Sequence, residues 1–289
     1  MILEDILRKK WKEVGLGFLN LTAVAVVIAL VQPVLREYTP AAGTAMLALL
    51  CLATYILASR LIERRTPTEL AVNRALPEGA AGIVIGFLLF AAVMAVLLVV
   101  GVYHPAGWGT TRGLANGFLF AVMAGITEEI LFRGLLFRLS SKLVGTWGAL
   151  IFTSGLFGLA HQANPGATLA SSVAIALEAG VLLGAAYAAT QRLWLPIGLH
   201  IGWNFTEGPL FGMTLSGNKM TEGVLRGSLS GPGMLTGGAF GPEASIVAVM
   251  VCLVAALYFL WRIVKLHRAE PAMWTKPGRE DAERAEMLC

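Results

Sequence analysis

Six polar residues in the middle of this chain are of the types and at the spacings that hydrolysis requires. In chain order they are Glu128, Glu129, Arg133, His161, His200 and Asn204. A carboxylate can take a proton from water, an imidazole can orient that water, and an amide can donate to an oxyanion. Charged groups are costly at membrane depth, so in a strongly apolar chain they are usually functional. These six residues are therefore the candidate site.

Helical spacing gives the two adjacent glutamates different surroundings. Each residue of a helix advances by about 100°, so Glu128 and Glu129 face different directions. Glu129 and Arg133 stand four residues apart on one face, where they can form an ion pair. Glu128 has no such local partner and is left free to act as a general base. An alternative remains open, in which both glutamates and Arg133 form a buried ionic clasp between helices.

The two histidines inside apolar segments complete the set. Asn204 follows His200 by one helical turn and lies on the same face. His161 ends its segment and can be an ordinary interfacial residue, whereas His200 and Asn204 can simply hydrogen-bond to a neighbouring helix. The other two histidines of the chain fall in a loop and in the C-terminal tail. We expect the two embedded imidazoles, Glu128 and Asn204 to meet in one cavity.

The same residues permit a metal. Two histidines and a glutamate, here His161, His200 and Glu128, match a catalytic zinc triad with one open position. The motif His-Glu-x-x-His is absent, so the chain is no ordinary zinc protease of that type. Metal-free activation of water by Glu128 is equally compatible with these side chains, and the sequence leaves both mechanisms open.

Composition places these residues in a lipid bilayer. Hydrophobic residues make up 56% of the chain, charged residues 14%, and the mean hydropathy is +0.72. Since soluble domains are about 25% charged and no segment alternates as a barrel strand does, the sequence predicts an all-α, polytopic membrane helix bundle. The eight expected spans lie near residues 14–34, 41–61, 80–102, 113–135, 146–163, 167–190, 194–211 and 244–264.

Basic residues indicate the orientation. Counted from an inside N-terminus, the outside loops hold only four of the 22 lysines and arginines, namely Arg36, Arg112, Lys219 and Arg226. This asymmetry predicts that both termini are cytoplasmic, in the plasma (inner) membrane if the source is bacterial. The first span lacks a cleavage site and is expected to be retained. The basic ends suit phospholipid headgroups, and no nucleic-acid partner is expected.

The chain reads as one membrane domain, residues 1–289, with a motif core at 113–211 and a cytoplasmic tail at 265–289. The outside loop 212–242 is rich in glycine and is expected to be flexible. It can serve as a lid over a site or as a plain connector. No oligomeric state is predicted.

Spacing along the spans raises a geometric problem. At about 1.5 Å per residue, simple counting places His161 and His200 about 12 Å apart in depth. They can meet only if the helix of the fourth span continues through Phe132–Lys142 into the cytoplasmic interface. The site would then open toward the cytoplasm. Glu178, in the sixth span, either hydrogen-bonds to another helix or lines the same cavity, and is left outside the catalytic set.

The chain resembles the CAAX prenyl protease and bacteriocin-processing family (CPBP, also called Abi). That family has the motifs Glu-Glu-x-x-x-Arg, Phe-x-x-x-His and His-x-x-x-Asn. They occur here, in order, as Glu128-Glu129 with Arg133, Phe157 with His161, and His200 with Asn204.

The resemblance implies an integral membrane endopeptidase whose substrates are lipidated or membrane-associated peptides and proteins, as in CAAX-box processing. It also implies Glu128 as the base, His161 and His200 as its partners, and Asn204 in the oxyanion site. The family is named as metalloproteases, although a metal-free glutamate mechanism is argued for some members, so either zinc or no cofactor is implied.

Two other classes of function compete with hydrolysis. A proton-coupled transporter would use Glu128, Glu129, His161 and Glu178 as a relay, but related halves with broken helices, which many transporters have, are not visible in the sequence. A membrane immunity or binding protein without catalysis would keep the same fold and need no turnover.

Overall fold

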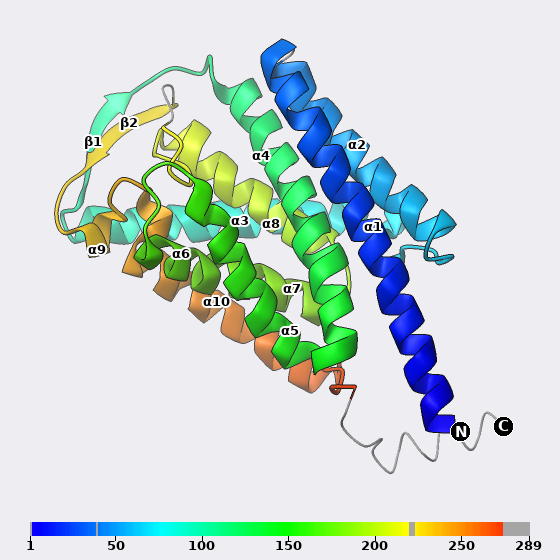
Figure 1. Ribbon diagram of the computed structural model, residues 1–289. Helices are drawn as coiled ribbons and strands as arrows, with labels where there is room; N and C mark the ends of the chain where they lie inside the picture. Colours follow the sequence, from blue (N-terminus) through cyan, green and yellow to red (C-terminus); the bar gives the residue numbers. More distant parts are fainter. Residues whose placement is uncertain (1, 39, 220–222, 274–289) are drawn as a thin grey trace.

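The protein is an all-α bundle. The computed structural model describes residues 2–38, 40–219 and 223–273 (Figure 1). Its α-helices are α1 (Ile2–Tyr38), α2 (Pro40–Leu61), α3 (Ala75–Val99), α4 (Leu114–Glu129), α5 (Arg138–Ala160), α6 (Leu169–Ile175), α7 (Val181–Thr190), α8 (Trp194–Phe205), α9 (Gly233–Thr236) and α10 (Ile246–Lys265). Short 3₁₀ helices lie at Thr68–Leu70, Val72–Arg74, His161–Ala163 and Pro242–Ala244.

Three π-helical segments interrupt or extend these helices. Ile130–Phe137 joins α4 to α5, Ala176–Gly180 joins α6 to α7, and Thr206–Leu210 extends α8. The eight expected spans are largely helical, but the described helix at 194–211 is not among those long enough to cross a membrane. Within the described residues, six continuous helices are long and apolar enough to cross a membrane, and one of them, Leu114–Ala163, covers two of the expected spans. The predicted all-α membrane fold is confirmed.

The long helix Leu114–Ala163 contains the stretch on which the meeting of the histidines was expected to depend. Phe132–Lys142 is helical throughout, as predicted, first in π and then in α geometry. The helix then bends at Gly145, whose φ of 73° lies in the left-handed region that favours glycine. The backbone of residues 270–272 packs against this bend, and the Thr146 amide donates to the Glu270 carbonyl at 3.0 Å.

A small sheet lies at the loop end of the bundle. Strand β1 (Tyr103–Trp108) pairs antiparallel with β2 (Leu225–Leu229). The sequence predicted only loops there, because neither strand is long enough to show an alternating pattern. The described parts of the loop 212–242 thus contain β2, α9 and a 3₁₀ turn, while the expected flexibility of this loop stays a prediction.

Helices α3 and α8 run side by side through the middle of the bundle (Figure 1). Two glycines four residues apart on each helix meet there: Gly82 and Gly86 on α3, and Gly198 and Gly202 on α8. A β-carbon at any of the four would collide with backbone of the opposite helix. Lipid gives little hydrophobic drive for helices to associate, so close backbone approach through small residues supplies the packing instead.

A polar network that includes Arg65 and Glu69, both between two spans, holds the first π segment. The Arg138 Nε donates to the Gly134 carbonyl at 2.8 Å, and the Tyr55 hydroxyl oxygen lies 3.1 Å from the same carbonyl oxygen. Glu69 accepts from Tyr55 and from Arg65. Burial opposes ionisation of Glu69, but the Arg65 guanidinium outweighs it and lowers the pKa of that carboxyl. The network thereby fixes the helix that carries the candidate site.

The contact between α3 and α8 predicts that a methyl group added at one glycine of α3 destabilises the protein more than a methyl group added at another. Gly86→Ala should destabilise the protein by about 1–3 kcal/mol, because its β-carbon overlaps α8 backbone and the helices must separate. Gly79→Ala, on the same helix, is the matched control, since its β-carbon meets no atom within 4 Å. Thermal unfolding in detergent measures both; equal midpoints for the two variants would contradict the packing argument.

Candidate active site

Glu128 and Glu129 lie at the end of α4, directly before the π segment that carries Arg133. The Glu129 side chain is fully buried, whereas that of Glu128 is 31% exposed. Arg133 Nη1 donates to Glu129 Oε1 at 2.8 Å, which confirms the predicted pair. The two carboxylates therefore have separate surroundings, and the alternative in which both are tied into one ionic clasp is not observed.

Arg133 also contacts two other helical segments. Its Nη2 donates to the carbonyls of Ala179 and Gly180, at 3.2 and 3.1 Å, in the π segment between α6 and α7. Its guanidinium lies over the Phe157 ring, 4.6 Å from the centroid. The ion pair thus joins α4 to α5 and to the α6–α7 helix.

The imidazoles are oriented through their Nδ1 atoms. His161 Nδ1 lies 2.8 Å from the Phe157 carbonyl oxygen, and His200 Nδ1 lies 3.0 Å from Glu129 Oε1. Both Nε2 atoms are consequently turned toward Glu128. Glu128 Oε2 lies 3.9 Å from Nε2 of His161 and 4.0 Å from Nε2 of His200. The predicted convergence of Glu128 with both rings is therefore present.

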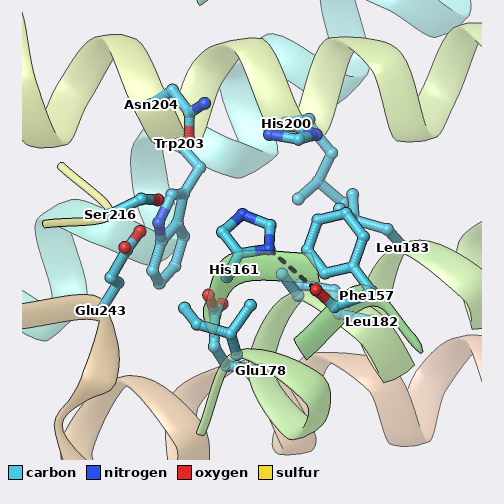
Figure 2. Close-up of a pocket in the computed structure, with 13 residues that line it drawn as sticks. Phe157, His161, Glu178, Leu182, Leu183, His200, Trp203, Asn204, Ser216 and Glu243 are labelled. Atoms are coloured by element: carbon cyan, nitrogen blue, oxygen red, sulfur yellow. Dashed lines mark hydrogen bonds between the residues drawn. The ribbon is translucent and has the colours of Figure 1, made fainter. Parts of the chain in front are cut away.

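Two cavities meet at these side chains. The front cavity, of about 270 Å³, is lined by Glu128, His161, His200 and Asn204, with further walls from α1, α4 and the loop that contains Ser216. The rear cavity, of about 30 Å³, is lined by His161, Glu178, Trp203 and Glu243 among others (Figure 2). Asn204, one turn after His200 on α8, borders both cavities. All six predicted residues are thus gathered around one place.

The donor atoms can be compared with a zinc sphere. Zinc bonds of about 2.0–2.2 Å in tetrahedral geometry place neighbouring donor atoms about 3.3–3.5 Å apart. The distances from Glu128 to His161 and His200 are wider, and within the described residues no group of three metal-binding side chains is close enough to hold an ion. The residue types suit zinc, but as placed they do not fit around one, and we derive no step through a metal.

Several neighbours of the site were not identified from the sequence. The contact between Glu129 and His200 joins residues 71 positions apart, so no local spacing indicates it. Trp203, Ser216 and Glu243 line the rear cavity, as does Glu178, for which lining the cavity was one of the two expected alternatives. Isolated polar residues of this kind form no motif, and only the packing of helices brings them together.

The structure predicts that substitution of Glu129 destabilises the protein much more than substitution of Glu128. Glu129→Ala should cost about 3–5 kcal/mol, because it leaves the buried Arg133 without its partner. Glu128→Gln should unfold close to the wild type. Glu78→Ala serves as a control, since it breaks the more exposed pair with Arg192 and should cost about 1 kcal/mol or less. Unfolding midpoints in detergent test this order of destabilisation. Equal midpoints for Glu129→Ala and Glu78→Ala would refute the role of Glu129 in holding Arg133.

Comparison with known proteins agrees with this geometry. A family model described as type II CAAX prenyl endopeptidase Rce1-like matches residues 110–206. No curated protein and no solved structure matches the chain. The matched segment contains all three motifs, from Glu128 to Asn204, and the structure gathers them into one site. Residues 110–206 are therefore similar to type II CAAX prenyl endopeptidases, and this similarity supports the resemblance to the CPBP family.

Proposed function

We propose that the protein is an intramembrane endopeptidase that hydrolyses a peptide bond of a membrane-associated or lipidated peptide or protein. The observation that carries this proposal is the position of Glu128. Its Oε2 has no hydrogen-bond partner within the described residues and faces Nε2 of His161 and of His200. Distances of 3.9 and 4.0 Å are too long for direct hydrogen bonds and suit a bridging water molecule.

In this mechanism Glu128 takes a proton from the water held between its carboxylate and the His161 ring. The resulting hydroxide adds to the carbonyl carbon of the scissile bond. Asn204 lies next to His200 on the neighbouring wall of the front cavity, where its amide can donate to the oxyanion that forms. Glu128 then passes its proton to the departing amine, which breaks the carbon–nitrogen bond.

Glu129 and Arg133 serve the reaction indirectly. Glu129 accepts from both Arg133 and His200 through the same Oε1 atom. This contact fixes the plane of the His200 ring and turns Nε2 toward the cavity. His161 is fixed in the same way by the Phe157 carbonyl. The rings are therefore already in place before substrate binds, which lowers the reorganisation that the reaction requires.

The substrate is proposed to lie within the bilayer or at its edge. Ile28 and Gln32 of α1 and Phe120 of α4 form part of the front cavity, so the site faces helices that are apolar enough to meet lipid. The distribution of basic residues supports an orientation in which both termini are cytoplasmic.

Removal of the base tests the mechanism. Glu128→Gln keeps the shape of the side chain and removes proton acceptance, so the rate of peptide cleavage in proteoliposomes should fall by about 10²–10⁴-fold. Glu13→Gln is the control, because Glu13 pairs with Lys142 away from the cavities. Cleavage by Glu128→Gln at the wild-type rate would exclude Glu128 as the base.

Metal dependence is a separate test. Because the donor atoms stand wider apart than a zinc sphere, we expect the purified enzyme to keep its cleavage rate within about twofold after treatment with a strong zinc chelator. Elemental analysis of the same sample gives the metal content per chain. Loss of activity on chelation, followed by recovery with stoichiometric zinc, would overturn the metal-free mechanism.

A further inference from the structure

The rear cavity is small and deeply buried, yet several polar side chains line it. Glu178, Trp203 and Glu243 border it and are each at least nine-tenths buried. Figure 2 shows the indole nitrogen of Trp203 on the side that faces Ser216 and Glu243. The volume of about 30 Å³ has room for about two water molecules.

Several polar atoms around this cavity have no hydrogen-bond partner within the described residues. They are Nε1 of Trp203, Oε1 of Glu243 and both carboxyl oxygens of Glu207, which lies beside Glu243. A buried polar group without a partner costs about 1–3 kcal/mol. Only a small ligand that can both donate and accept hydrogen bonds would satisfy a set that includes an indole N–H and carboxyl oxygens. Water has that character and fits the volume.

Glu207 lies beside Glu243, and both side chains are fully buried. Ser216 lines the rear cavity next to Glu243 (Figure 2). Glu243 therefore presents a carboxyl oxygen without a partner to the cavity, and the Glu207 carboxyl lies directly behind it.

The rear cavity adjoins the front cavity through shared walls. His161, His200, Asn204 and Ser216 line both cavities. A peptide in the front cavity would cover the approach to Glu128 from that side. The water consumed in each turnover must then reach Glu128 by another route, and the side chains around His161 provide one.

We propose that the rear cavity is a water-binding site that supplies the hydrolytic water to Glu128 past His161 and Asn204. Trp203, Glu207 and Glu243 hold this water, and they act as positioning residues that touch neither substrate nor the scissile bond. The proposal rests on the proposed function, because it requires hydrolysis at Glu128. It predicts that the water is present whether or not the enzyme is active.

The test combines two double variants with a direct readout of buried water. Glu207→Met with Glu243→Met replaces both partners of the pair by apolar side chains of similar length, which keeps the fold while drying the cavity. Glu207→Gln with Glu243→Gln keeps the cavity polar and removes both carboxyl groups. Radiolytic hydroxyl labelling of the full-length protein in nanodiscs reports water next to Trp203, with the apolar and equally buried Met94 as the dry control.

We expect Trp203 to be labelled in the wild type and in Glu128→Gln, and Met94 to stay unlabelled. The methionine pair should lose the label at Trp203 and lower kcat by at least tenfold, with KM within about twofold and an unfolding midpoint at or above that of the wild type. The glutamine pair should keep the label and a kcat well above that of the methionine pair.

Three results would overturn the proposal. The first is a wild-type Trp203 as unlabelled as Met94, a result that does not depend on the methionine pair folding. The second is a dry methionine pair with wild-type kcat. The third is a glutamine pair that keeps the label but loses as much kcat as the methionine pair, which would assign the cavity to proton transfer. None of these three results depends on the activity of Glu128→Gln. Wild-type activity in that variant would instead refute the proposed function.

Discussion

The buried ion pair of Glu129 with Arg133 is the interaction on which the site depends. Further hydrogen bonds offset part of the cost of burying the two charges: Arg133 also donates to carbonyls of the α6–α7 helix, and Glu129 also accepts from His200. One salt bridge thus connects four separate helical segments at a single point. Such a pair adds little net stability but allows few alternative arrangements, which is what a catalytic site needs.

The π segments contribute to the same end. All three lie around the site: one carries Arg133, one supplies the carbonyls that Arg133 contacts, and the third carries Glu207. A π turn leaves backbone groups less regularly paired than an α turn does and often occurs at functional sites. Here the first π segment is held by Tyr55 and Arg138 through the Gly134 carbonyl. The irregular backbone is tolerated at depth because protein atoms satisfy it.

The two glutamates show how one dipeptide supplies two kinds of chemistry. Glu129 points into the protein and builds the scaffold, while Glu128 points into the front cavity and keeps a carboxylate oxygen available. The histidines divide in the same manner, since each uses Nδ1 for the scaffold and Nε2 for the cavity. Polar groups are costly to bury at this depth. Each histidine therefore has one ring nitrogen in contact with the protein and leaves the other ring nitrogen available in the cavity.

The sequence by itself determined the helical membrane fold and the pairing of Glu129 with Arg133, and it named the candidate site residues that the structure brings together. These follow from local regularities: the length of apolar runs and the separation of four residues that places side chains on one helical face. Only the tertiary structure decided the contact of Glu129 with His200, the glycine contact between α3 and α8, the small sheet, and the rear cavity with Glu178, Glu207 and Glu243. Those features join residues far apart in the chain, and their positions depend on how helices cross, which no local spacing encodes.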